Sequence, residues 1–251
     1  MKMNKKTIFV TGATSGVGLK ITELLVSQGH QVYATGRNMV ALKALERLGA
    51  HVLQADLTSL DAIDALCAQL PEIDVAILCA GIGKFGIAPE LTDEVIAQMV
   101  ELNVTVPIYL SKRLAAKMMA RGQGQLILIG SQAGKVATPK ASVYAATKHA
   151  IVGFTNGLRM ELAPYNIHVT VIHPGPIDTP FLDQASDESG YRQSLGRFLL
   201  TPEYVAKETV KTIVHPVREV NLPRIMGLTS KLYVLAPAVI ERLAKPLFNK
   251  K

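Results

Sequence analysis

Short runs of β-branched and apolar residues alternate with longer amphipathic segments along most of the chain. Strands are predicted at residues 7–10, 31–35, 51–55, 75–79, 125–129 and 167–172, and helices at 17–28, 39–48, 60–70, 92–120 and 143–162. Each predicted strand is almost entirely apolar, which is expected of strands that are covered on both faces. Six strands joined by crossover helices predict an α/β fold built on a doubly wound parallel sheet.

The chain has 251 residues and contains no internal repeat or low-complexity linker, which predicts a single domain that spans residues 1–251. Residues 178–200 interrupt the alternation with a mixture of glycine, serine, aspartate and aromatic residues. Loops in that position, beyond the carboxyl ends of the strands, build the ligand crevice of such sheets. A helix at 202–215 and a short strand at 219–222 are predicted after this segment.

Composition excludes several classes of protein. Hydrophobic residues make up 49% of the chain and charged residues 19%, which is too little charge for a disordered protein. Every apolar stretch is shorter than the ~20 residues that a membrane-spanning helix needs. Basic residues outnumber acidic ones by 27 to 20, but there is no tryptophan and no basic cluster interleaved with aromatic residues, so no nucleic-acid partner is expected. Two cysteines cannot build a disulfide framework, and the apolar run near the start is too brief for a signal peptide, so a cytoplasmic location is expected.

Three glycines, Gly12, Gly16 and Gly18, lie in the turn between the first predicted strand and helix. Glycine allows a positive φ and lets backbone N–H groups approach a pyrophosphate, whose charge is favoured at a helix N-terminus. The alternative is an ordinary glycine-rich turn. The position between a strand and a helix favours dinucleotide binding.

The end of the second predicted strand indicates which dinucleotide is bound, because a carboxylate there would accept a hydrogen bond from the adenine ribose 2′-hydroxyl. This chain instead has Gly36, Arg37 and Asn38. The planar guanidinium of Arg37 suits a 2′-phosphate, which favours NADP(H) over NAD(H); the alternative is a solvated charge that leads into a helix. Asp56, at the end of the third strand, either accepts from the adenine amino group or serves as a turn or cap residue.

The spacing of Ser131, Tyr144 and Lys148 predicts an active site. Ser131 follows the strand at 125–129, and Tyr144 and Lys148 share one face of the next helix because they are four residues apart. A phenol is a poor acid or base near neutral pH unless a nearby cation favours its phenolate, and Lys148 is that cation. Tyr144 would protonate the alkoxide that forms when a carbonyl is reduced, while Ser131 hydrogen-bonds the same oxygen.

Together these motifs resemble the compact form of the short-chain dehydrogenase/reductase family, and the resemblance covers nearly the whole chain. It implies a Rossmann-like fold and explains the glycine spacing. Asn103 falls on the asparagine that helps, in the family, to hold a water between the lysine and solvent, so the implied catalytic residues are Asn103, Ser131, Tyr144 and Lys148. Lys148 gains a second role, a hydrogen bond to the nicotinamide ribose. Thr179, in the segment after the sixth strand, is implied to contact the nicotinamide carboxamide.

The resemblance extends the set of expected cofactor contacts beyond the glycine-rich turn. Contacts with NADP(H) are expected from Gly12, Thr14, Ser15, Gly16, Val17, Gly18, Arg37, Asn38, Asp56, Leu57, Ala80, Gly81, Tyr144, Lys148, Pro174, Gly175, Ile177 and Thr179. The chain departs from the family where two asparagines are replaced by Leu78 and Cys79, which removes their side-chain hydrogen bonds and leaves the backbone of Ala80 and Gly81. Cys79, at an apolar strand end, is interpreted as a small buried residue.

No metal site is predicted, because the histidines at 30, 51, 149, 168, 173 and 215 have no metal-ligand spacing with each other or with the cysteines. The C-terminal extension, residues 225–251, carries an apolar helical seam of Leu228, Leu232, Leu235, Val239 and Leu243. This seam packs over the substrate crevice or against a partner subunit, or it contacts a membrane surface.

The sequence predicts an NADP(H)-dependent oxidoreductase that acts on a small-molecule ketone or secondary alcohol, with residues 178–200 as the substrate loop. The alternative is an NADP(H)-binding redox sensor or scaffold without turnover. The resemblance also implies a homodimer or homotetramer, packed through the helices at 92–120 and 143–162.

Overall fold

A seven-stranded parallel sheet forms the centre of the molecule. The computed structural model describes residues 5–186 and 191–248, and the strand order in the sheet is β3-β2-β1-β4-β5-β6-β7. The strands are β1 (Thr7–Thr11), β2 (Gln31–Gly36), β3 (His51–Gln54), β4 (Val75–Leu78), β5 (Gly124–Ile129), β6 (Ile167–Pro174) and β7 (Glu219–Leu222). The doubly wound parallel sheet is confirmed. The short strand at 219–222 pairs with β6 in parallel, so the sheet has one strand more than the six counted from the crossover pattern.

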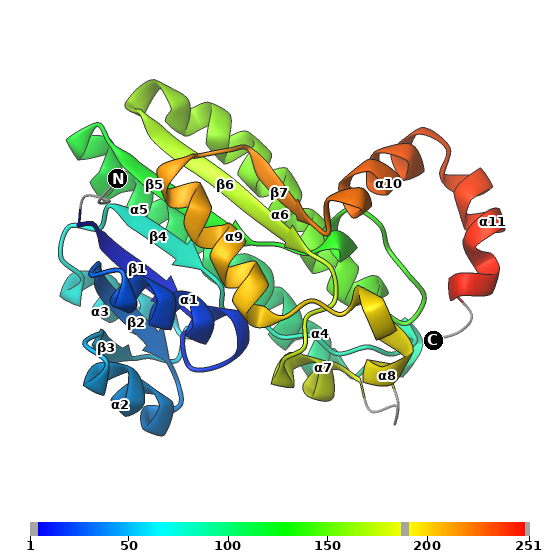
Figure 1. The fold of residues 1–251 in the computed structure, drawn as a ribbon, viewed down its shortest axis with the longest axis horizontal. Coiled ribbons are helices and arrows are strands. Elements are labelled where there is room, and N and C mark those ends of the chain that lie inside the picture. Colours follow the sequence, from blue (N-terminus) through cyan, green and yellow to red (C-terminus); the bar gives the residue numbers. More distant parts are fainter. Residues whose placement is uncertain (1–4, 187–190, 249–251) are drawn as a thin grey trace.

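Helices cover both faces of the sheet, as Figure 1 shows. One face packs against α1 (Gly16–Ser27), α2 (Met39–Arg47) and α9 (Pro202–Val214), and the other against α3 (Leu60–Gln69), α5 (Val106–Arg121) and α6 (Ser142–Leu162). In β1, Ile8 and Val10 belong to the first core and Phe9 to the second, and all three are fully buried. This alternation follows from the two-residue period of a strand. The apolar character of the strands, read from the sequence, has this two-sided burial as its cause.

The direction of winding reverses between β1 and β4. Chain order runs outward from β1 to β3 on one side and from β4 to β7 on the other. In open parallel sheets, ligands bind outside the carboxyl ends of the strands at this point of reversal. The glycine-rich turn follows β1, and the Leu78–Gly81 segment follows β4, so the fold brings both to that place.

The helix predicted at 92–120 is interrupted by a π-helical turn. The structure has α4 (Asp93–Val100), a π-turn (Glu101–Thr105) and then α5. Pro107 has no backbone N–H and cannot make the ordinary helical bond to the carbonyl of Asn103, which favours a local change of winding. π-turns occur frequently at functional sites, and this one contains Asn103.

Residues 178–200 are not a featureless loop. They contain α7 (Pro180–Ala185), α8 (Tyr191–Leu195) and a 3₁₀ turn (Gly196–Phe198), while residues 187–190 lie outside the described part. In the C-terminal extension, α10 (Arg224–Leu235) and α11 (Pro237–Phe248) point away from the sheet (Figure 1), and Tyr233 and Glu241 join them through a 2.7 Å hydrogen bond. Leu228, Leu232, Leu235 and Val239 of the predicted seam are exposed; the side chain of Leu243 is outside the described set.

In the part of the chain that the structure describes, four 3₁₀ turns lie between the larger elements. Besides the turn at Gly196–Phe198, they are Ala88–Glu90, Gln132–Gly134 and Ala163–Tyr165. In the residues that the structure describes, no helix is both long and apolar enough to cross a membrane.

Candidate active site

The turn between β1 and α1 is packed so closely that only glycine fits at its key positions. A Cβ atom on Gly12 would lie 2.9 Å from the backbone of Ala80, and one on Gly18 would lie 2.2 Å from the carbonyl oxygen of Gly12. Gly16 has a φ of +52° and faces Thr179. The turn therefore presents backbone and the N-terminus of α1 at the carboxyl edge of the sheet, where an anion is favoured.

The hydroxyl of Thr11 holds the backbone of the segment after β4, where the family has two asparagines. Its Oγ1 accepts hydrogen bonds from the backbone N–H groups of Cys79 (3.0 Å) and Ala80 (3.1 Å). Leu78 is buried in the core, whereas Cys79 is half-buried rather than buried as expected, and desolvation of its thiol raises the pKa to about 11. The segment after β4 is thus held by its backbone, and the Cys79 thiol is un-ionised at neutral pH.

The end of β2 lies against the glycine-rich turn. Gly36 contacts the side chain of Thr14, and the N–H of Ala13 bonds to the carbonyl of Thr35 at 3.0 Å. Arg37 is exposed beside this contact, and its carbonyl accepts from Gln54 at 3.0 Å. An exposed guanidinium next to the turn is placed to meet a phosphate on the adenosine half of a dinucleotide.

Asn38 and Asp56 have local partners. The Asn38 side chain caps α2 by accepting from the N–H of Ala41 at 3.1 Å. The Asp56 carboxylate accepts from the N–H (3.1 Å) and hydroxyl (2.9 Å) of Thr58, and these hydrogen bonds lower its pKa. Asp56 thus takes part in a turn before α3 through one carboxylate oxygen, and the expected contact with the adenine amino group stays a prediction.

Helix α6 carries Tyr144 and Lys148 on the face that packs into the protein. Tyr144 is 8% exposed and Lys148 7% exposed, and the Lys148 Nζ lies 5.7 Å from the centre of the Tyr144 ring. Nζ also donates to the carbonyl of Ile129 at the end of β5, at 3.2 Å. Burial lowers the pKa of Lys148 to about 8, so the group is mostly a cation at pH 7 and is easily deprotonated above that.

Asn103 connects the π-turn to this pair. Its Oδ1 accepts from the N–H of Ile82 at 2.9 Å, and its Nδ2 donates to the Ile82 carbonyl (2.8 Å) and to the Thr147 hydroxyl (3.1 Å). A Cβ on Gly81 would lie 3.0 Å from Asn103 Oδ1 and 3.7 Å from Lys148 Nζ. The residues after β4, the π-turn and α6 thus converge on one point.

Ser131 begins the short 3₁₀ turn that packs on α6. Its Oγ accepts from the N–H of Ala133 at 3.1 Å. The turn fits only because residue 134 is glycine, whose Cβ would lie 2.6 Å from the carbonyl oxygen of Lys148. The structure therefore brings together the turn that carries Ser131 and the helix segment that carries Lys148.

A buried polar network behind Ser131 carries no motif in the sequence. His173 Nδ1 lies 3.3 Å from the Ser131 carbonyl, and Gln132 Nε2 donates to the His173 carbonyl at 2.7 Å. Burial, together with the charge of Lys135, lowers the pKa of His173 to about 4, so the ring is neutral at pH 7. The only hint was the place of His173 at the end of a strand that leads to the crevice.

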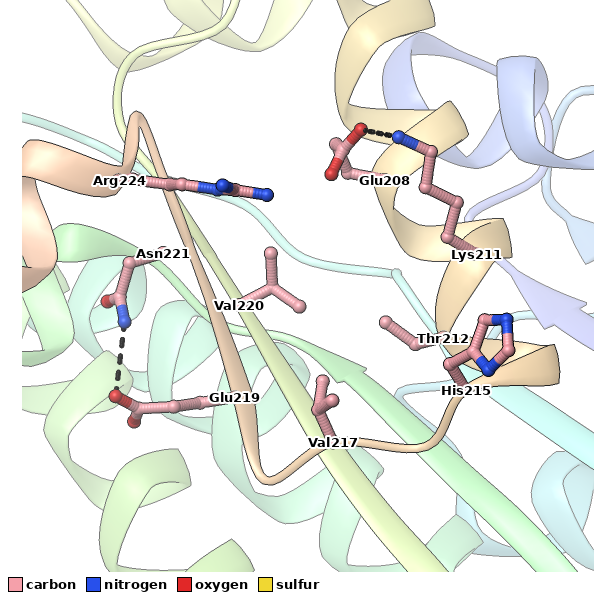
Figure 2. Close-up of a pocket in the computed structure, with 9 residues that line it drawn as sticks. All are labelled: Glu208, Lys211, Thr212, His215, Val217, Glu219, Val220, Asn221 and Arg224. Atoms are coloured by element: carbon pink, nitrogen blue, oxygen red, sulfur yellow. Dashed lines mark hydrogen bonds and ion pairs between the residues drawn. The ribbon is translucent and has the colours of Figure 1, made fainter.

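An ion pair completes this network at β7. Lys135 donates to Glu219 Oε1 at 2.8 Å, and Asn221 Nδ2 donates to the same oxygen at 3.1 Å. Glu219, Asn221 and Arg224 are among the residues that line a surface groove of about 460 Å³ between β7 and α9. Figure 2 shows the Glu219 and Asn221 side chains on the side of β7 away from Glu208 and Lys211. A second hollow lies between α1 and α9. None of the residues expected to bind the cofactor or to act in catalysis lines either hollow.

Two phenylalanines contact the Tyr144 ring, and sequence reasoning missed both. The centre of the Phe85 ring lies 5.7 Å away, in an edge-to-face arrangement, and that of Phe181 lies 5.8 Å away. Phe85 is in the loop after β4 and Phe181 is in α7. No motif marks these positions, because their role follows from how two loops meet.

The remaining expected contacts are distributed around the same edge of the sheet. Thr179 is buried against Gly16, and Ile177 forms a parallel bridge with Leu200. Gly175 bonds through its N–H to the Leu222 carbonyl at 2.7 Å. The side chains of Val17, Leu57 and Pro174 are buried, so a ligand could reach only their backbone; Ser15 is exposed at the start of α1. Over the described ranges, no three His, Cys, Asp or Glu side chains gather as a metal site would require.

Comparison with known proteins gives consistent matches. The sequence model of the family described as short chain dehydrogenase matches residues 6–190. A putative ketoacyl reductase of Streptomyces coelicolor is 32% identical over 85% of this chain and 91% of its own length. Among solved structures, a serine dehydrogenase complexed with NADP+ is 30% identical, with a TM-score of 0.81 over 86% of this chain and 93% of that one. A short-chain dehydrogenase from Sphingobium yanoikuyae in complex with NADPH is 26% identical, with a TM-score of 0.81 over 93% and 96%.

Proposed function

Because the chain belongs to the short-chain dehydrogenase/reductase family and is an oxidoreductase of that family, we propose that it interconverts a ketone and a secondary alcohol with NADP(H), using Tyr144 as the general acid and base. The observation that carries this proposal is the buried pair on α6. The Lys148 amine lies 5.7 Å from the centre of the Tyr144 ring, and both residues are buried. A buried Tyr and Lys in that arrangement are costly for stability and serve proton transfer.

The glycine-rich turn fits a dinucleotide. Its tight packing leaves backbone N–H groups and the α1 N-terminus as the surface that a pyrophosphate would meet, and any Cβ on Gly12 or Gly18 would disrupt it. Thr179 lies beside Gly16 of this turn and Gly81 lies beside Lys148, which supports these three residues as the ones that would hold the nicotinamide half. When bound, the nicotinamide cofactor supplies or accepts a hydride.

The residues of the chain itself manage the proton. Lys148, as a cation, lowers the free energy of the Tyr144 phenolate, so the Tyr144 hydroxyl gives up its proton more readily to the oxygen of a reduced carbonyl. The Ser131 hydroxyl stabilises the same oxygen by a hydrogen bond. Asn103 holds the π-turn and the Ile82 backbone against α6 and so positions this group of residues. In the oxidation direction, the Tyr144 phenolate accepts the proton.

Preference for NADP(H) rests on Arg37. The guanidinium is exposed beside the glycine-rich turn, and no carboxylate stands at the end of β2 to accept from a ribose 2′-hydroxyl. A 2′-phosphate would therefore meet a charge-assisted, bidentate donor. The complexes of two similar structures with NADP+ and NADPH support this preference.

The two irregular segments have different roles in this proposal. Residues 178–200 form the substrate loop, since Phe181 of α7 contacts the catalytic tyrosine. Residues 225–251 form a C-terminal extension beside the site, since α10 packs on β7 and on the turn that begins at Ser131.

A turnover screen tests the proposal. Purified protein is supplied with NADPH or NADH and a panel of ketones, and cofactor oxidation is followed by absorbance. Reduction of at least one ketone, faster with NADPH and abolished by Tyr144→Phe, is the expected result. Tight NADPH binding without turnover of any ketone or secondary alcohol would instead favour a redox sensor or scaffold.

A further inference from the structure

Two phenylalanine rings, those of Phe85 and Phe181, contact the ring of Tyr144. Phe85 lies edge-on to the tyrosine, with an interplanar angle of 74°, and Phe181 is tilted by 53°. Both rings are only partly exposed. Each belongs to a different loop, so two independent segments supply an aromatic ring to the same point.

These rings are fixed by the backbone of the loops that carry them. The N–H of Phe85 donates to the carbonyl of Ala185, the last residue of α7, at 2.6 Å. The N–H of the following residue, Gly86, donates to the Lys140 carbonyl at 2.7 Å. The Phe181 ring lies on Gly83, where a Cβ would come within 2.5 Å of its Cζ atom. The two loops are therefore joined at both phenylalanines.

Helix α7 is also held from the other side by Arg192 in α8. Its guanidinium donates to both oxygens of Asp183, at 2.9 and 2.8 Å, and to the Thr179 carbonyl at 3.1 Å, and it pairs with Asp178. One nitrogen of this guanidinium, Nη2, makes the contacts with Asp183 and Thr179, and Nη1 makes the pair with Asp178. Phe181 is thus attached to a helix that is tied to the residues expected to meet the nicotinamide.

Phenylalanine rings have consequences for what can lie beside Tyr144. They offer no hydrogen-bond donor to a carboxylate and no conventional acceptor to a hydroxyl, so either group placed there loses its water without replacement. An aromatic substituent loses no such partners and gains edge-to-face and offset contacts with both rings. The two phenylalanine rings would therefore discriminate between substrates by the group attached to the carbonyl carbon.

We propose that the substrate carries an aromatic ring on or next to its carbonyl carbon, and that Phe85 and Phe181 are the specificity-determining residues that hold this ring beside Tyr144. The inference rests on the proposed function, because it assigns the substrate class of the same site. It disfavours hydroxy amino acids, whose carboxylate would find no hydrogen-bond donor on the phenylalanine rings, and it ranks aryl ketones above linear alkyl ketones of equal size.

The kinetic test compares acetophenone with 2-octanone, two methyl ketones with the same number of carbon atoms, in the presence of NADPH. Wild type is expected to show a kcat/KM for acetophenone at least tenfold higher. Phe85→Leu and Phe181→Leu keep an apolar side chain but remove the ring, and each should lower that ratio at least threefold, chiefly through KM. Phe154→Leu is the matched control, since this phenylalanine packs against the core on α6, and should leave the ratio unchanged. A wild-type ratio near one, or a ratio that neither site variant moves, overturns the inference.

A binding test separates this inference from the proposed function. Protein loaded with NADPH is titrated calorimetrically with 1-phenylethanol and with 2-octanol, which do not react with the reduced cofactor. Tighter binding of 1-phenylethanol, lost in the Phe85→Leu and Phe181→Leu variants, supports the aromatic site even if no ketone is reduced, in which case only the proposed reaction is wrong. Turnover of ketones with equal binding of the two alcohols would show that the reaction is right and the aromatic site wrong. Serine oxidised faster than either alcohol would also overturn the site.

Discussion

At the scale of single residues, the ring and the hydroxyl of Tyr144 have separate roles in the proposed function. The ring packs against its neighbours, and the hydroxyl transfers the proton. The ring contacts Phe85, Phe181 and the Lys148 ammonium, and Tyr144→Phe preserves all of these contacts. NADPH binding should therefore persist while kcat falls by ~10²–10⁴-fold, the usual contribution of a proton-transfer group. Stopped-flow or steady-state rates, with cofactor affinity measured by fluorescence, check this. A rate within twofold of wild type would contradict the proposed role.

Burial of Lys148 lowers the stability of the fold by an amount that depends on pH. Because the pKa falls from 10.5 to about 8 on folding, the unfolded chain binds more protons between these values, and the folded state is penalised most below pH 8, by roughly 3 kcal/mol. Lys148→Met should raise the thermal midpoint at pH 7. The gain should shrink as pH rises from 8 to 10.5, where the wild-type amine becomes neutral in both states.

The control for this measurement is Lys43→Met, which changes an exposed lysine on α2. It should shift the midpoint little at any pH. Calorimetric scans at pH 7, 8.5 and 10 give the comparison. A Lys148→Met variant that is less stable than wild type at pH 7 would show that the buried cation is compensated by interactions other than those described here.

Cofactor choice depends on the charge of one exposed side chain. Arg37→Ala should remove most of the preference for NADPH over NADH, which we expect to be at least ~1.5 kcal/mol, the size of one charge-assisted hydrogen bond. The affinity for NADH should change little. Arg47→Ala, at the far end of α2, is the control and should leave both dissociation constants unaltered. Equal affinity of wild type for the two cofactors would refute the assignment.

At the scale of elements, the contact between the glycine-rich turn and α1 leaves no room for a side chain. Gly18→Ala would place a carbon 2.2 Å from the carbonyl oxygen of Gly12, so the turn must move and NADPH affinity should fall by at least tenfold. Gly153→Ala in α6 is the matched control. Nothing in the same chain lies within 4 Å of the added carbon, and Gly153 is far from the glycine-rich turn, so NADPH affinity should remain unchanged. Dissociation constants and unfolding midpoints of both variants decide the matter.

The elements were predictable where local chemistry determines them. The β-branched runs gave six strands in their correct places, and the glycines gave the turn after β1. The π-turn at Glu101–Thr105 was missed because the apolar periodicity runs through it, and its cause is the single missing N–H of Pro107.

In the candidate site too, local spacing was predictable and contacts between distant segments were not. Tyr144 and Lys148 share a helix face by their spacing, whereas Phe85 and Phe181 meet only because two loops bond to each other across the fold. The network of His173, Lys135 and Glu219 likewise depends on the pairing of β6 with β7. Contacts between residues distant in sequence leave no periodic signal for a single sequence to carry.

At the scale of the whole molecule, we expect self-association through α5 and α6. The outward face of α6 has small residues at helical spacing, Ala146, Ala150, Gly153 and Gly157, which would let a helix of a second copy approach closely. Light scattering should give a mass of two or four times 27.1 kDa at micromolar concentration. Ala150→Arg should reduce the mass, and Ala68→Arg, on exposed α3, should not. A wild-type particle of 27.1 kDa would contradict the expectation.

The residues proposed to transfer the proton and the two phenylalanines proposed to determine specificity come from different parts of the chain. Tyr144 and Lys148 lie on the long helix α6 and Asn103 lies in the π-turn between α4 and α5. Phe85 lies in a loop and Phe181 on a six-residue helix, and these two segments are joined to each other. Natural selection or a protein engineer can therefore change what the enzyme recognises by exchanging two short segments, without altering the helices that perform the reaction. Laboratory evolution toward a new substrate should accumulate its first mutations between residues 82 and 87 and between residues 177 and 186, and leave Asn103, Ser131, Tyr144 and Lys148 unchanged.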